Sequence, residues 1–121
     1  MKDENYLPID DYGIIGNMRS AALVGVNGSI DWFCFPHFDS PSIFAKILDS
    51  GIGGHFCICP LGDYKTKQFY WPDTNVLITR YLTDKGIAEV SDFMPVGPHI
   101  HTEYDYRIIR RVTGINGKVR M

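Results

Sequence analysis

Apolar and polar residues alternate with a period of two along most of this chain. Such alternation is typical of strands that bury one face and expose the other. The pattern predicts seven strands, over residues 21–26, 30–35, 54–60, 64–71, 75–83, 86–93 and 107–115. We therefore predict an all-β protein, an antiparallel β-sandwich.

Turn signals join several of these strands. Asn27 and Gly28 are the preferred pair for a type I′ hairpin turn, which needs positive φ at both residues. Residues 84–86 end in a glycine and predict a second short hairpin. Asn116 and Gly117 predict a turn into a return strand, of which only four residues follow.

Strands usually run about five or six residues, so a return strand of only four residues is cut short. We therefore predict that residues 1–121 form one domain that is truncated at its C-terminal end. An incomplete sheet leaves an open edge, which is a template for pairing with another chain. We expect self-association into a homo-oligomer through this edge.

One segment has helical rather than alternating spacing. Its apolar residues at 43, 44, 47 and 48 would share one face of a short helix over 43–49, with Ser40 or Ser42 as its N-cap. Gly51 would end it. The predicted fold is thus an antiparallel sandwich with one short helix.

Composition narrows the class of protein. A charged share of 21% is that of an ordinary globular domain, and the cations are too scattered for a nucleic-acid surface. The apolar runs are too short to span a membrane, and the N-terminus has no apolar signal segment. Three cysteines, an odd number, argue against a secreted disulfide framework, so we expect a cytoplasmic setting.

Candidate chemistry gathers in the loop after the second strand, where polar residues stand between two prolines. Asp31, His37, Asp39 and Ser40 could reach the pocket of a neighbouring domain and hold sugar hydroxyls. Alternatively, Asp31 bonds backbone donors beside the hairpin and Asp39 caps the turn before the helix. Neither acid is predicted to be catalytic within this chain.

Aromatic residues offer two further readings. Trp32 is expected in the core, on the face it would share with Ile30 and Cys34 if the alternation holds. Tyr70 and Trp71 stand just before a proline turn and are the runner-up platform for stacking on a sugar ring.

Several polar residues admit a structural interpretation. Cys57 and Cys59 would face the same way on a strand, but structural zinc needs four ligands, which His37 or His55 would have to complete. We therefore predict buried thiols, and neither a metal nor another cofactor. Other polar side chains are expected in a solvated loop (His99, His101 and Glu103), at a strand end (Asp92) and at a strand edge or surface (Arg110 and Arg111).

Two motifs make the chain recognisable, and they are Gly28-Ser29-Ile30-Asp31-Trp32-Phe33-Cys34 and Phe38-Asp39-Ser40-Pro41-Ser42-Ile43-Phe44. With segments 8–17, 22–24, 75–77 and 90–95, they resemble the N-terminal domain of prokaryotic glycoside hydrolase family 15 enzymes, the glucoamylase and trehalase-like group. Asn27 stands where this family more often has Asp. His37 stands where it usually has Arg, so a charge role does not carry over to His37.

The resemblance implies part of a β-supersandwich that precedes a large (α/α)6 barrel, and the barrel is absent from this chain. In that family the barrel carries the two glutamates of an inverting glycosidase, whose carboxylates lie about 6.5–9.5 Å apart. The three glutamates of this chain all lie outside the loop, at Glu4, Glu89 and Glu103. The resemblance therefore implies an enzyme as the parent protein and a chain that is inactive alone.

The expected function is that of a non-catalytic domain of an α-glucoside hydrolase acting on an α-glucan or a trehalose-type substrate. It would pack on the barrel and shape the pocket rim, with substrate contacts from Asp31, Trp32, His37, Asp39 and Ser40. The alternatives are an independent carbohydrate-binding module that uses Tyr70 and Trp71, and an assembly domain that uses the open sheet edge. We expect no nucleic-acid or membrane partner.

Overall fold

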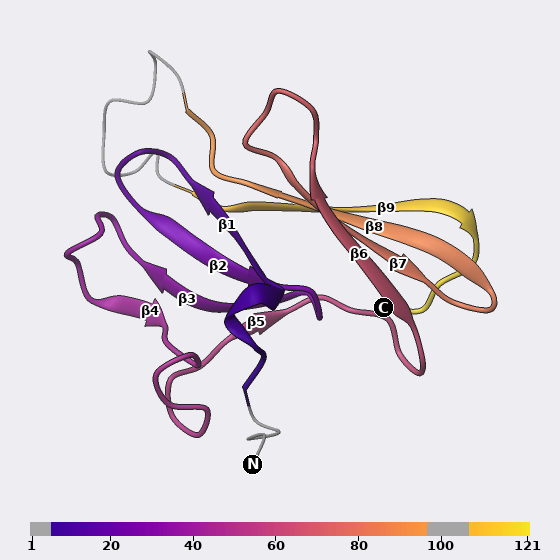
Figure 1. Cartoon of the computed structure of the whole chain (residues 1–121), viewed down its shortest axis with the longest axis horizontal. Coiled ribbons are helices and arrows are strands. Elements are labelled where there is room, and N and C mark those ends of the chain that lie inside the picture. Colours follow the sequence, from indigo (N-terminus) through magenta and orange to yellow (C-terminus); the bar gives the residue numbers. More distant parts are fainter. Residues whose placement is uncertain (1–5, 97–106) are drawn as a thin grey trace.

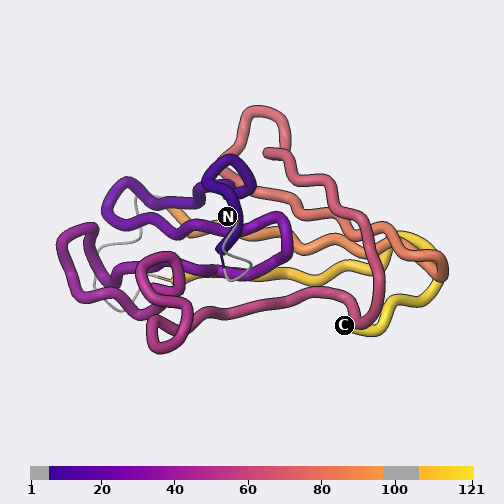
Figure 2. The backbone as a smooth tube through the Cα atoms, turned by 60° about the horizontal axis from the view of Figure 1, so that its bottom comes forward, coloured from indigo at the N-terminus to yellow at the C-terminus, as the bar shows by residue number. Residues whose placement is uncertain are grey.

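The computed structural model describes residues 6–96 and 107–121, and it consists of two antiparallel sheets (Figures 1 and 2). A 3-10 turn, η1 (Ile9–Asp11), precedes the first sheet. That sheet has the order β1-β2-β3-β4, with β5 also paired to β3. Its strands are β1 (Tyr12–Gly16), β2 (Ala21–Gly25), β3 (Ser29–Cys34), β4 (Ser42–Phe44) and β5 (Phe56–Cys57).

The second sheet has the order β6-β7-β8-β9, in which each strand pairs with its neighbour in sequence. Its strands are β6 (Lys65–Tyr70), β7 (Leu77–Leu82), β8 (Gly86–Phe93) and β9 (Ile109–Gly117). The predicted all-β antiparallel architecture is therefore confirmed.

The core lies between the sheets. Ile15, Val24 and Ile30 from the first sheet are at most 1% exposed, as is Leu77 from the second. Burying each aliphatic side chain is worth about 1.5–3 kcal/mol. Val24, Ile30 and Leu77 lie in strands that the alternation predicted, whereas Ile15 lies in β1, which the pattern did not predict.

The helix predicted over 43–49 is wrong. Residues 42–44 form β4 instead, since the free side of β3 offers backbone partners at Phe33 and Cys34. A helix of two turns has too little propensity to compete with such pairing. The chain then makes a loop over residues 45–53, whose ends meet where the Ala45 N–H donates to the Gly53 carbonyl at 2.8 Å.

The type I′ turn at Asn27 and Gly28 is also wrong, because only Gly28 has positive φ, at 81°. The Gly28 N–H donates to the Gly25 carbonyl at 2.9 Å. The connection is therefore a three-residue loop with its left-handed residue last, a common alternative for hairpins.

The chain end differs from the predicted hairpin. β9 runs on through Asn116 and Gly117, which pair with Ile87 and Gly86 of β8. The chain turns only after Gly117, where φ is 64°. It then leaves the second sheet, and the Leu61 N–H donates to the Arg120 carbonyl at 2.8 Å.

Candidate functional site

The loop after β3 forms a compact turn. The His37 N–H donates to Ser40 Oγ and the Ser40 N–H donates to the His37 carbonyl, both at 3.1 Å. The Phe38 N–H donates to the Arg19 carbonyl at 2.9 Å, which ties the loop to the β1–β2 connection. His37 and Asp39 are exposed on this turn. Because no helix follows, Asp39 does not cap one.

Asp31 lies in a β-bulge and is buried, with 2% of its surface exposed. Leu23 pairs with Trp32 and Val24 pairs with Ile30, so Asp31 is the extra residue between them. Its carboxylate accepts hydrogen bonds from the Tyr12 hydroxyl and from Ser29 Oγ, each at 2.5 Å. Burial, together with the Asp31 carboxylate, raises the pKa of Tyr12. The structure therefore brings Asp31 together with Tyr12 and Ser29, while Asp39 lies exposed in the loop.

The bulge decides where Trp32 points. An extra residue reverses the alternation, so Trp32 lies on the outer face of the first sheet, opposite to Ile30. The prediction that Trp32 shares a face with Ile30 in the core is wrong for this reason. Trp32 lines a groove of about 320 Å³, together with Ile14, Ala21, Leu23, Ile47 and Leu48.

All six residues of this outer groove are apolar. Sugar sites combine apolar surface with a few polar groups that fix the ligand's orientation. The outer groove lacks such groups in its lining, so its chemistry suits apolar protein side chains better than a sugar.

Tyr70 closes one side of the sandwich. Its hydroxyl donates to the Ile14 carbonyl at 2.7 Å and accepts from the Ile14 N–H at 3.0 Å. Asn75 Nδ2 donates to the Gly16 carbonyl at 3.3 Å, on the same strand. A side chain of β6 and one of the β6–β7 connection thus bond the edge of β1. The Trp71 ring stays 56% exposed beside this contact.

Cys57 and Cys59 converge as predicted, since their sulfurs lie 3.5 Å apart. The prediction that they are buried thiols is wrong, because Cys57 is exposed and Cys59 is only partly buried, while Cys34 is buried. Removal of the Cys57 sulfur from water, and then its contact with Cys59, raise the pKa of Cys57 to about 11. Cys57 is therefore a thiol at neutral pH. Within residues 6–96 and 107–121, no three His, Cys, Asp or Glu side chains gather as metal ligands. His99, His101 and Glu103 lie outside the described residues.

Arg110 and Asp92 form a buried ion pair that the sequence pattern did not predict. Arg110 Nε lies 2.7 Å from Asp92 Oδ1, and the two side chains are 3% and 0% exposed. Arg110 also donates to the carbonyls of Phe56 at 2.8 Å and Gly28 at 2.6 Å. Burial raises the pKa of Asp92, against the opposing effect of the guanidinium. Arg110 joins β8 and β9 to the first sheet.

Two expectations are corrected by this pair. Arg110 lies on the edge strand β9, as expected, but its side chain is buried and only Arg111 is exposed. Asp92 lies next to the end of β8, but it pairs with Arg110 instead of fixing a turn. The sequence did contain a signal for a buried acid, because Asp92 is in phase with Ala88 and Val90, which are buried. An acid in phase with core positions needs a buried partner.

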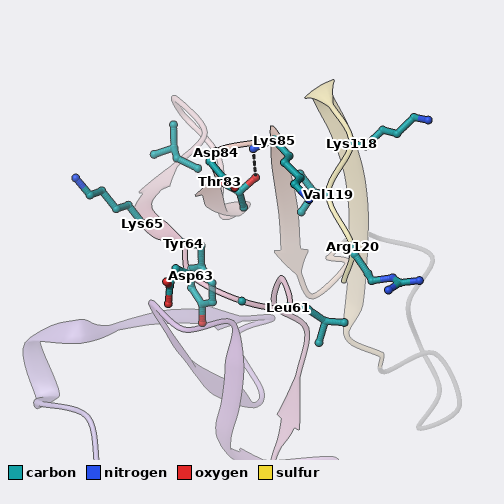
Figure 3. A pocket seen from close by; sticks show the side chains of 12 residues that line it. Leu61, Asp63, Tyr64, Lys65, Thr83, Asp84, Lys85, Lys118, Val119 and Arg120 are labelled. Atoms are coloured by element: carbon teal, nitrogen blue, oxygen red, sulfur yellow. Dashed lines mark hydrogen bonds between the residues drawn. The ribbon is translucent and has the colours of Figure 1, made fainter.

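A larger cleft of about 860 Å³ opens at the end of the second sheet (Figure 3). It lies between residues 61–65, the β7–β8 turn and residues 118–120. In Figure 3 the Val119 side chain points into the cleft, while Lys118 and Arg120 point away from it. The site residues predicted from the sequence lie elsewhere. In the part of the chain that the structure describes, no helix is long and apolar enough to cross a membrane.

These features define an all-β sandwich domain with a buried ion pair between its layers and an apolar groove on its outer face. The family model described as "Trehalase-like, N-terminal" matches residues 1–120. The chain therefore belongs to the trehalase-like N-terminal family.

Several relatives of known name are similar to this chain. A trehalase of Thermoplasma volcanium is 45% identical over 76% of the chain and 15% of its own length. Trehalase 1 of Sulfolobus acidocaldarius is 49% identical over 70% of the chain and 15% of its length. A trehalase of Mycolicibacterium smegmatis is 33% identical over 94% of the chain and 19% of its length. The chain thus spans less than a fifth of these relatives, and no solved structure matches it.

Proposed function

We propose that this chain is the non-catalytic N-terminal domain of an α-glucoside hydrolase of glycoside hydrolase family 15, with trehalose as the substrate of the intact protein. The observation that carries this proposal is the match of residues 1–120 to a trehalase-like N-terminal family, together with named relatives of which the matched segment covers less than a fifth. In this proposal the remaining chain supplies the (α/α)6 barrel and the inverting pair of carboxylates.

The outer groove supports a packing role for the domain. Ile14 is 57% exposed and Leu48 is 75% exposed at its rim. An apolar surface of this kind is stabilised when a partner surface covers it. We assign this surface to contact with the catalytic barrel of the same polypeptide, in the cytoplasm, where the three free thiols would stay reduced.

The loop after β3 supports a role at the pocket rim. His37, Asp39 and Ser40 would supply its polar groups. Asp31 and Trp32 would contribute indirectly. The bulge at Asp31 sets the direction of β3, and β3 leads into the loop. This is the part of the proposal that substitution tests directly.

The test uses the full polypeptide encoded by the gene, assayed for hydrolysis of trehalose and maltooligosaccharides. Asp39→Ala should lower kcat/KM for trehalose about tenfold or more, the worth of a hydrogen bond to a charged group. Asp63→Ala is the matched control, because Asp63 is an exposed aspartate far from the loop. Equal effects of both changes would remove the rim role, and hydrolysis by residues 1–121 alone would overturn the proposal.

A second candidate function is sugar binding by the isolated domain. The observation in its favour is the pair of neighbouring exposed rings, with Tyr70 48% and Trp71 56% exposed. Titration calorimetry of residues 1–121 with maltooligosaccharides and trehalose decides between the two functions. Binding that is lost in Trp71→Ala would favour the module.

A further inference from the structure

We propose that the polypeptide following Met121 forms a strand that pairs antiparallel with residues 55–61, so that the chain passes from the second sheet to the first. β5 is the part of this segment that is already paired, with β3 on one side. The inference rests on the proposed function in one respect, namely that the chain continues beyond Met121 as it does in the longer relatives.

The hydrogen bonds of this segment leave one edge for a new strand. The Ile58 N–H donates to the Gly28 carbonyl at 3.1 Å, toward the β2–β3 hairpin. Its carbonyl accepts from the Tyr81 hydroxyl at 2.8 Å. Backbone groups alternate along a strand, so those of Cys57, Cys59 and Leu61 point to the opposite edge.

Pro60 agrees with this arrangement. A proline has no N–H, and it interrupts a ladder only on the edge to which its N–H would point. Pro60 falls in phase with Ile58, on the edge that faces the hairpin. The opposite edge therefore keeps its donors at positions 57, 59 and 61.

The first hydrogen bond of the proposed pairing already exists, between the Leu61 N–H and the Arg120 carbonyl at 2.8 Å. In Figures 1 and 2 the last residues return from the far end of the second sheet and stop beside the end of the segment that follows β5. They run opposite to the direction of that segment. Continuing this antiparallel register places Cys59 opposite the first residue after Met121 and Cys57 opposite the third.

The side chains of the last residues already alternate as in a strand. Val119 is half-buried and points into the cleft, while Lys118 and Arg120 are exposed and point away (Figure 3). Met121 follows on the Val119 side and is 38% exposed. A further strand on this path would cover the apolar side chains of both.

The chain's own continuation is a better occupant of this edge than a second copy. It is held beside the edge by the Leu61–Arg120 bond, and a short tether gives an effective concentration on the order of millimolar. A second copy would have to reach the edge by diffusion and displace that continuation.

Hydrogen exchange resolved to single amides tests the pairing. The chain of residues 1–121 is compared with the full polypeptide encoded by its reading frame. We expect the amides of Cys57 and Cys59 to exchange at least tenfold more slowly in the full polypeptide. The Ile58 amide is the internal control, because its bond to Gly28 is present in both forms.

A substitution gives a second readout. Cys59→Pro removes an N–H from the proposed edge, whereas Cys59→Ser keeps it. The proline variant should melt at a lower temperature than the serine variant, by a larger difference in the full polypeptide than in residues 1–121. The comparison of the two lengths separates the pairing from strain within the segment.

Three results would overturn the inference. The first is equal exchange of the Cys57 and Cys59 amides in residues 1–121 and in the full polypeptide. In that case, trehalose hydrolysis by the full polypeptide would still support the proposed function. Protection in residues 1–121 that grows with protein concentration would assign the edge to a second copy. A reading frame that ends at Met121 would remove this inference and the proposed function together.

Discussion

Gly28 shows how one residue can be required for two reasons. Its φ of 81° lies in the left-handed region, which costs other residues about 1–2 kcal/mol. A Cβ at this position would also fall inside the contact distance of the Tyr81 hydroxyl and the Ile58 carbonyl. The β2–β3 hairpin can therefore approach both groups only because residue 28 has no side chain.

Gly28→Ala should lower the free energy of unfolding by about 2–4 kcal/mol, since overpacking adds to the backbone cost. Gly62→Ala is the matched control, with a φ of 84° and no atom within 4 Å of the added Cβ. Its cost should be only the backbone part, about 1–2 kcal/mol. Urea denaturation measures both, and equal losses would show that the close approach has no energetic weight.

Cys57 makes stability depend on alkaline pH. Its pKa rises from 9.0 to about 11 on folding, mainly through burial. The unfolded chain therefore loses this proton first, and the stabilisation is fully present below pH 9 and lost as pH rises to about 11. Urea denaturation between pH 8 and pH 11 should show a decline that is shallower in Cys57→Ser. An identical decline in both proteins would contradict the assignment.

At the scale of elements, alternation predicted the second sheet well and the first sheet less well. The strand predicted over 54–60 is paired only at β5, and β1 was not predicted. The strand predicted over 86–93 coincides with β8, and that over 64–71 contains β6. Trp32 was placed on the wrong face because the bulge at Asp31 arises from pairing between β2 and β3. The residues 42–44 became a strand through pairing with β3, which is equally invisible in a local window.

The candidate site was predictable only in part, for the same reason. The loop of His37, Asp39 and Ser40 was found from local composition, because prolines and polar residues mark turns. Arg110 was missed, since its partners Asp92, Phe56 and Gly28 come from three other parts of the chain. The outer groove was also missed, because the groove forms only when Trp32 lies on the outer face of the first sheet.

Arg110 is expected to dominate the link between the sheets. Arg110→Met should cost about 3–5 kcal/mol of stability, because it leaves the Asp92 carboxylate buried without a partner. Arg80→Met is the control, since the Arg80–Glu89 pair also joins neighbouring strands, but the Arg80 side chain is 39% exposed. Its cost should be about 0–1 kcal/mol. Thermal unfolding of the two variants separates the predictions, and similar losses would count against the buried link.

At the scale of the whole molecule, the outer groove should matter only when the rest of the protein is present. Leu48→Asp should leave the stability of residues 1–121 within about 0.5 kcal/mol, because Leu48 is 75% exposed there. In the full polypeptide it should cost about 1–3 kcal/mol, as a polar group is buried against the barrel. Calorimetry of the Leu48→Asp variant in residues 1–121 and in the full polypeptide measures this difference.

Ile52→Asp is the matched control for that experiment, because Ile52 is 87% exposed and lies outside the groove lining. It should be neutral in both lengths. If Leu48→Asp were equally neutral in the full polypeptide, the groove would not be the contact with the barrel.

The hydroxyl of Tyr70 and the amide of Asn75 have a consequence for aggregation. They form hydrogen bonds with main-chain groups of Ile14 and Gly16, so side chains occupy positions on the β1 edge where a further strand would pair. Fibril growth by edge-to-edge stacking needs two receptive borders on every molecule, one to accept a neighbour and one to offer to the next. A first sheet whose β1 edge is occupied in this way can pair edge to edge only through its other edge, so stacking of first sheets stops at two molecules.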